Sequence, residues 1–307
     1  MTYTLTLLID EYIAYCELQK RLDVKTLKAY RIDLKQFSNY FKNIDITTIS
    51  ISHIESFIGH LNENFKPKTA KRKYASLKAF FRYLEYKDII QTNPINKIRT
   101  KFRLPVLLPK TIPLYTIESF LSAIYHERSV ANTVFRRKRT LLDAAIAETL
   151  FSTGMRISEL CNLKESDVDL QDCSIRIYGK GSKERIIQIG SDEVIQLLKQ
   201  YKHEFLSEID KSGYFFTNTN SSQISDQAVR RMINKYCNLA AIDLHITPHM
   251  FRHTFATCLL EADVDIRYIQ EMLGHSSITV TEIYTHVALS KQKDILVTKH
   301  PRKDFNF

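Results

Sequence analysis

Three prolines within nine residues limit the folds open to this 307-residue chain more than any other local feature. Pro105, Pro109 and Pro113 cannot lie inside a helix or a central strand, because proline fixes φ and lacks the backbone N–H. The stretch therefore predicts an extended linker at residues 104–112, with separate domains at 1–103 and 113–307. A chain of this length is compatible with two domains.

The positive charge of the chain lies almost entirely in the first of these segments. Residues 1–103 hold 19 Lys and Arg against 10 Asp and Glu, whereas the remaining residues hold 25 against 24. This asymmetry predicts an N-terminal domain that binds a polyanion and a nearly neutral domain with another role. With 44% hydrophobic residues and only 7 glycines and 7 prolines, a turn-rich all-β fold is disfavoured.

Apolar residues recur at helical spacing in four segments of the first domain, which predicts a small four-helix bundle. Asp23 is the expected cap of the second helix, and Ser52 with Glu55 forms a possible capping box for the third. The fourth helix is expected at residues 69–86. The densest basic cluster of this domain precedes and begins it: Lys66, Lys68, Lys71, Arg72 and Lys73.

The second domain mixes helical and strand patterns, so a mainly α (α+β) protein is expected. Helical patterns cover residues 139–151, 192–205, 226–241 and 247–262, and a last helix should stop at Gly274. Strand patterns cover residues 174–178, 185–189 and 214–217. The first two strands flank a glycine-containing turn and predict an antiparallel hairpin.

The sequence shows no secretory signal, membrane span or paired cysteines, and this predicts a cytoplasmic location. The N-terminal apolar run has no basic start and leads at once into Asp10 and Glu11, unlike a secretory signal. No stretch reaches the roughly 18 apolar residues of a membrane span. The five cysteines are scattered without a C-x-x-C pair, as free thiols of a cytoplasmic protein would be.

Several polar fragments of the second domain have ordinary explanations when taken singly. Arg156 and Glu159 could form a surface ion pair on one helix turn. Lys180 lies between glycines as any hairpin turn requires, without the upstream glycine of a phosphate-binding Walker loop. His275 could simply satisfy a helix end, and Tyr284 is one of 16 tyrosines.

A zinc site is the alternative for the histidines at 245, 249 and 253, because histidines four apart on a helix can share a metal. Met250 stands where a metalloprotease helix carries its glutamate, and Pro248 separates His245 from the helix. We therefore disfavour zinc hydrolysis, and no metal or other cofactor is expected.

In combination, these residues resemble a known family. Two arginines, a lysine, two histidines and a tyrosine occur in the order of the tyrosine recombinase (phage integrase) superfamily, most like its bacterial Xer-type members. The matching segments are residues 152–160, 179–185, 247–257, 273–278 and 283–287. The resemblance implies a helical, SAM-like core-binding domain followed by a mixed α/β catalytic domain with a small antiparallel sheet.

The resemblance also implies that DNA strands are cut and rejoined through a 3′-phosphotyrosine. Tyr284, the last tyrosine of the chain, would be the nucleophile. Arg156 and Arg252 would each present a planar fork of donors to the scissile phosphate. The covalent link conserves the bond energy, so neither ATP nor a metal is implied.

The remaining family positions are also matched in this chain. Lys180 would protonate the leaving 5′ oxygen, while His249 and His275 would bind the phosphate and assist proton transfer. Glu159 would orient Arg156. His253 adjoins the motif but has no family role.

The partner implied is double-stranded DNA with paired half-sites, held in a clamp by both domains. The cluster at residues 66–73 would contact phosphates, although a solvated helix face is an equal alternative for any one lysine. A second basic run at residues 136–139 could add to this binding.

The family also implies a homotetramer on two DNA sites, with or without a sister recombinase or accessory protein. The tail at residues 290–307 would either pack on a neighbouring protomer or stay free.

Two other functions use the same residues. A type IB topoisomerase-like enzyme would nick and close DNA, and a regulator would bind DNA without cutting it. The biological role, whether mobile-element integration and excision or Xer-like resolution, does not follow from the sequence.

Overall fold

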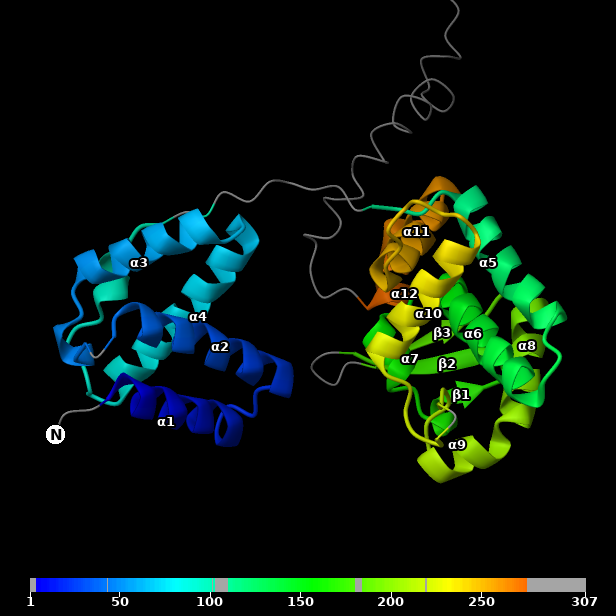
Figure 1. Cartoon of the computed structure of the whole chain (residues 1–307), viewed down its shortest axis with the longest axis horizontal. Helices are drawn as coiled ribbons and strands as arrows, with labels where there is room; N and C mark the ends of the chain where they lie inside the picture. The colour runs from blue at the N-terminus through cyan, green and yellow to red at the C-terminus, as the bar shows by residue number, and fades with distance from the viewer. Residues whose placement is uncertain are drawn as a thin grey trace, which may run out of the picture. The chain divides into compact units, whose positions relative to one another are not determined.

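The computed structural model describes residues 4–42, 44–100, 102, 110–179, 184–218 and 220–274. The chain divides into two compact units, Met1–Leu107 and Leu108–Phe307, drawn in Figure 1. Each is described by itself. Most of the predicted linker, residues 104–109, lies outside the described residues, but Ile112 is buried in the second unit, where its N–H donates to Thr254 Oγ1 at 2.7 Å.

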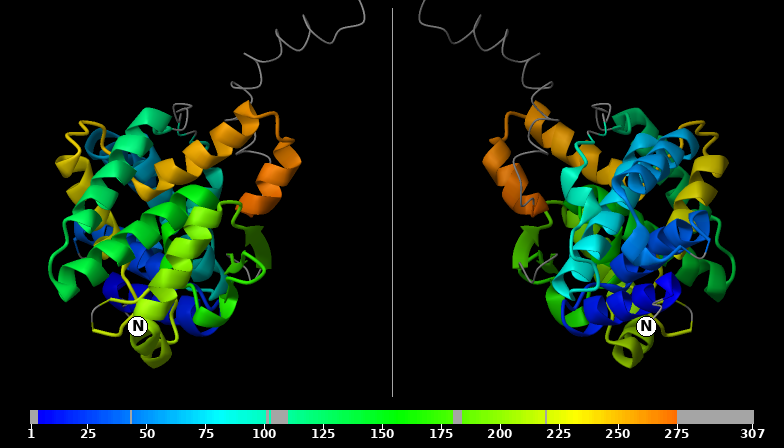
Figure 2. Two further views of the ribbon diagram at one scale, coloured as in Figure 1. Left: turned by 90° about the vertical axis from the view of Figure 1, so that its right-hand side faces the viewer. Right: turned by 90° about the vertical axis from the view of Figure 1, so that its left-hand side faces the viewer.

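The N-terminal unit is a helical bundle, as the apolar spacing predicts. Its helices are α1 (Leu5–Leu18), α2 (Val24–Tyr40), α3 (Ile51–Asn64) and α4 (Pro67–Tyr86), with short 3₁₀ helices at Ile46–Thr48 and Pro94–Lys97. Helix α4 packs against the other three, shown in blue to cyan in Figure 2. Aromatic side chains such as Tyr12, Phe37 and Phe80 fill the core.

Helix starts in this unit show how local hydrogen bonds set element boundaries. Asp23 caps α2 by accepting from the Thr26 N–H at 2.9 Å, as predicted. The capping box expected at Ser52 and Glu55 is wrong by two residues, because α3 is capped by Ser50. Its N–H donates to His53 Nδ1 at 3.1 Å, so a histidine takes the place of the usual glutamate.

A buried ion pair joins α2 to α4 in the middle of the bundle. Asp33 accepts from Lys73 Nζ at 3.0 Å and from Ser76 Oγ at 2.8 Å, and it also accepts from Arg72 Nη1. Both Asp33 and Lys73 are buried, with Lys73 only 4% exposed. Neither charge would be tolerated there without the other.

The C-terminal unit consists of helices around a small sheet. The helices are α5 (Leu114–Ser129), α6 (Val134–Thr153), α7 (Ile157–Cys161), α8 (Asp192–Glu204), α9 (Leu206–Ser212), α10 (Asp226–Leu239), α11 (Pro248–Glu261) and α12 (Ile266–Leu273), with a 3₁₀ turn at Glu165–Asp167. Helix α6 is buried along most of its length and packs against α5, α8 and α11. Helices α11 and α12, gold to orange in Figure 2, pack against each other.

The sheet is antiparallel with the order β1-β2-β3, formed by Val168–Asp169, Ser174–Tyr178 and Glu184–Gln188. Its hairpin pairs Tyr178 with Glu184, as the flanking patterns predict, and α12 packs against β3. The strand expected at residues 214–217 is wrong, because Tyr214 and Thr217 each make only an isolated bridge, to Lys164 and Gln223. The fold class is confirmed: mainly helical with a small antiparallel sheet.

The five cysteines all lie in the described part of the chain, and none of them is joined to another in a disulfide. In the part of the chain that the structure describes, no helix combines the length and the apolarity that a membrane crossing requires.

Replacing Asp33 by Asn should open the N-terminal bundle, because Lys73 would remain buried without an anionic partner. We expect a loss of about 3–5 kcal/mol, the usual cost of breaking a buried pair. Amide hydrogen exchange of peptides from α2 and α4 in the full chain measures it. Asp10→Asn, at an exposed position of α1, is the control and is expected to change protection by less than about 0.5 kcal/mol; equal protection in both variants would contradict this interpretation.

Candidate active site

The turn between α6 and α7 is the structural basis of the site. Helix α6 ends at Gly154, which adopts a left-handed φ of +58°. A Cβ at this position would lie 2.6 Å from Phe255 Cδ1 on α11, so both the backbone conformation and the close approach require glycine. Two residues later, Arg156 stands at the N-cap of α7.

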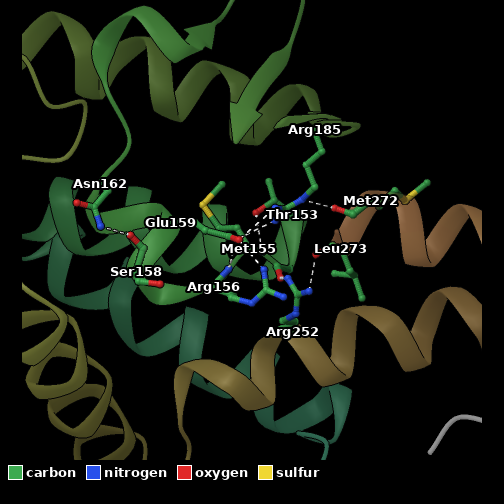
Figure 3. A network of polar contacts seen from close by, with 11 residues as sticks. Thr153, Met155, Arg156, Ser158, Glu159, Asn162, Arg185, Arg252, Met272 and Leu273 are labelled. Carbon is green, nitrogen blue, oxygen red and sulfur yellow. Dashed lines mark hydrogen bonds and ion pairs between the residues drawn. The ribbon is translucent and has the colours of Figure 1, made fainter. Parts of the chain in front are cut away.

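Glu159 is the centre of the polar network beside this turn (Figure 3). Its carboxylate accepts from the Arg156 N–H at 2.8 Å and from Arg156 Nη1 at 2.7 Å. It also accepts from Arg185 Nη1 at 3.1 Å and from Arg185 Nη2 at 2.7 Å. The side chain is only 6% exposed. Burial alone would raise its pKa, but the hydrogen bonds from Arg185 and Arg156 outweigh this effect and lower it, so the carboxylate stays ionised.

Arg252 is anchored on the other side of the same turn. It lies on α11, is 4% exposed, and donates from Nη1 to the Gly154 carbonyl at 3.0 Å and from Nη2 to the Leu273 carbonyl at 2.5 Å. These oxygens lie at the carboxyl ends of α6 and α12, where the helix dipole favours a cation. The plane of this guanidinium is therefore fixed by backbone atoms of two helices.

His249 lies one helical turn before Arg252, near the start of α11. Although the residue is exposed, part of its ring is shielded from solvent. This desolvation, with the charges of Arg230, Arg252 and Arg156, lowers the pKa of His249. His249 and Arg252 lie three residues apart on α11, which places them on the same side of this helix. The ring is held in its neutral form at neutral pH.

A groove of about 1010 Å³ runs along this network. It is bordered by α7, by the β2–β3 hairpin and by α12, and Arg156, Tyr178 and Gly274 are among its lining residues. The side chain of Arg156 is 34% exposed. Its Nη1 donates to Glu159, and the rest of this partly exposed side chain lines the groove.

The structure brings together four of the predicted catalytic residues: Arg156, Glu159, His249 and Arg252. The other three, Lys180, His275 and Tyr284, lie outside the described residues, as does the predicted tail. Sequence reasoning missed Arg185, which was assigned only to a strand. The available signal was its place at the end of the 179–185 motif segment.

The basic cluster of the N-terminal unit separates into two groups. Lys66, Lys68 and Lys71 are exposed around the first turns of α4. Arg72 and Lys73 instead bind Asp33, and Lys73 is buried. Lys73 is therefore not available to bind phosphate, contrary to the prediction, because its Nζ donates to Asp33 inside the bundle.

The second basic run also makes contacts within its own unit. Its partners are Glu127 for Arg136, the Ala131 carbonyl for Arg137, Glu208 for Lys138 and Asp143 for Arg139. Internal carboxylates thus balance much of this charge. As for metals, within the described residues no three His, Cys, Asp or Glu side chains are placed to share an ion.

Comparisons with known proteins agree with this geometry. The model described as Phage integrase family matches residues 124–291, and that described as Phage integrase, N-terminal SAM-like domain, matches residues 9–87. A tyrosine recombinase of Agathobacter rectalis is 63% identical over 299 residues, which cover 97% of this chain and 98% of the relative. Tyrosine recombinase XerC of Oceanobacillus iheyensis is 30% identical over 313 residues and covers 98% of both chains.

A solved structure shows the same fold. The XerH site-specific recombinase bound to palindromic difH substrate, in a post-cleavage complex, superposes with a TM-score of 0.72 at 21% identity. The match covers 95% of this chain and 84% of the other. The two family models and the sequence relatives confirm the resemblance identified from the sequence.

Replacing Arg230 by Gln should raise the pKa of His249, because it removes a positive charge that opposes protonation of the ring. Imidazole proton NMR titration of the full chain measures the shift. Arg231→Gln, the exposed neighbour on α10, is the matched control and should leave the titration unchanged. A His249 pKa that is equal in wild type and Arg230→Gln would show that this charge does not reach the site.

Proposed function

The chain belongs to the phage integrase family of tyrosine recombinases, and we propose that it cuts DNA with the phenol oxygen of Tyr284. It is an enzyme of site-specific DNA recombination that exchanges DNA strands. The family and its Xer-type relatives do not favour the topoisomerase-like or non-cutting alternatives.

The observation that carries the proposed mechanism is the fixation of two guanidinium groups around one turn. Arg252 is held by the Gly154 carbonyl. Arg156 lies two residues after Gly154 and is held by the Glu159 carboxylate. Attack on a phosphodiester builds negative charge on the non-bridging oxygens. Cations that are oriented before the reaction stabilise this charge without reorganisation, and losing one such donor typically costs about 10²–10³ in rate.

The proposed cleavage step exchanges one phosphate ester bond for another. Tyr284 Oη gives its proton to the neutral ring of His249 and bonds to phosphorus, while the bond from phosphorus to the 5′ oxygen breaks. Lys180 gives its proton to that oxygen, which leaves as a 5′ hydroxyl. A 5′ hydroxyl of the partner strand reverses these steps and releases the tyrosine. Bond energy is retained in the phosphotyrosine, so the cycle proposed here needs neither ATP nor a metal.

The histidines complete the proposed proton transfers. His249 is kept neutral by its surroundings, so its ring can accept a hydrogen bond or a proton as Tyr284 attacks. His275 would bind the same phosphate, because it follows the helix end to which Arg252 is anchored. Glu159 orients Arg156 and does not exchange protons, since its pKa is lowered.

The enzyme acts on double-stranded DNA, and we propose that the N-terminal unit binds its phosphates through Lys66, Lys68 and Lys71, with the exposed part of Arg72 beside them. A homotetramer on two sites, with the tail at residues 290–307 docking between protomers, is the proposed assembly; a sister recombinase could take alternate positions. The proposed location is the cytoplasm.

Tyr284→Phe should bind duplex DNA with unchanged affinity and form no covalent complex, because it lacks the attacking oxygen. The test uses a duplex selected from a random library by this variant and then nicked near the cleavage position, so that wild type is trapped. Denaturing electrophoresis measures the adduct. Tyr268→Phe on the exposed face of α12 is the control and should be trapped like wild type. An adduct formed by Tyr284→Phe would contradict the assignment.

The triple variant Lys66→Gln, Lys68→Gln and Lys71→Gln should weaken binding to every duplex sequence. If each lysine neutralises one phosphate, the slope of log affinity against log salt becomes shallower by about 3, at roughly 0.9 per contact. Equilibrium binding at several salt concentrations measures it. The control removes equal charge from the C-terminal unit at Lys199, Lys202 and Lys211; an equal slope change in both triples would exclude a specific role for α4.

A further inference from the structure

Arg185 joins three segments, each of which carries a residue of the proposed mechanism or lies next to one in the sequence. It lies on β3, immediately after the turn that contains Lys180. Its Nη1 and Nη2 reach Glu159 on α7, which holds Arg156, and its Nε donates to the Met272 carbonyl at 2.8 Å. Met272 lies in the last turn of α12, shortly before His275. Figure 3 shows this arrangement.

The contacts of Arg185 demand a guanidinium. Two nitrogens bind the two oxygens of one carboxylate, while a third, on another edge of the same plane, binds a backbone carbonyl. A lysine ammonium keeps the charge but is a compact point and cannot span these acceptors. Gly274 allows the arrangement, because a Cβ there would lie 3.1 Å from both Cδ and Nη1 of Arg185.

Arg185 differs from Arg156 in exposure. Its side chain is only 8% exposed, against 34% for Arg156. Both arginines share the Glu159 carboxylate, so the buried one fixes the anion that orients the more exposed one. The donors of Arg185 are directed at protein atoms, which makes it unsuited to bind the scissile phosphate directly.

We propose that Arg185 is a positioning residue for strand cleavage, which sets the relative positions of Arg156 and the end of α12 that leads to His275. This inference rests on the proposed function, in which Arg156 binds the scissile phosphate. Strand β3 then has two roles. It follows the turn that contains Lys180, and through Arg185 and Glu159 it fixes Arg156 at the start of α7. Movement of Arg185 would displace groups from α7, β3 and α12 together.

The test is Arg185→Lys, assayed by single-turnover formation of the covalent complex on the nicked duplex. We expect a cleavage rate lower by roughly 10- to 100-fold, as small misplacements of reacting groups commonly produce, with duplex affinity within about twofold of wild type. The matched control is Arg231→Lys on α10, an exposed arginine that does not line the groove, which should cleave at the wild-type rate.

A double-mutant cycle with Glu159→Gln separates positioning from independent effects. Because Arg185 acts through Glu159, adding Arg185→Lys to Glu159→Gln should lower the rate by less than about threefold further, the non-additivity of residues in one network. A wild-type cleavage rate in Arg185→Lys would overturn the proposal. So would a double variant in which the loss of rate equals the product of the losses in the two single variants. Loss of duplex binding by Arg185→Lys would also overturn it, because the residue would then serve folding alone. Absence of adduct with wild type would instead overturn the proposed function.

Discussion

The site depends on one buried carboxylate. Removing Glu159 from water is unfavourable, and its ionised form persists because Arg185 and Arg156 supply charged donors to both oxygens while the Arg156 N–H adds a further bond. Breaking such a buried arrangement leaves uncompensated charge in a region of low dielectric constant. The same bonds determine where Arg156 points. Stability of the turn and orientation of Arg156, the proposed phosphate ligand, therefore have a single physical cause.

Two helix ends provide the remaining constraints. Helices α6 and α12 both end in left-handed glycines, Gly154 and Gly274, and both present carbonyl groups to arginines. Arg252 binds the ends of both helices, whereas Arg185 binds only that of α12. The cations thus complement helix dipoles and remain fixed before DNA arrives. This preorganisation is what a reaction with developing phosphate charge requires.

Local signals in the sequence predicted much of this architecture. Helical spacing, the Asp23 cap, the hairpin and the stop at Gly274 depend on neighbouring residues, and the ordered motifs identified Arg156, His249 and Arg252. The misplaced capping box of α3 was a local error, since Ser50 and not Ser52 caps this helix. The other failures depended on distant contacts. The burial of Lys73 requires Asp33 on another helix, and Arg185 acquires its role only when α7, β3 and α12 meet. Residues 214–217 have strand propensity, but packing leaves them only isolated bridges.

In the proposed reaction, a tyrosine oxygen attacks a phosphate that two guanidinium groups hold. The most direct measurement is mass mapping of the peptide that remains attached to a nicked, library-selected duplex after incubation with the wild-type chain in excess EDTA. We expect a single nucleotide-linked peptide containing Tyr284, joined through a 3′ phosphate. Linkage at another residue, or attachment only after magnesium is restored, would contradict it.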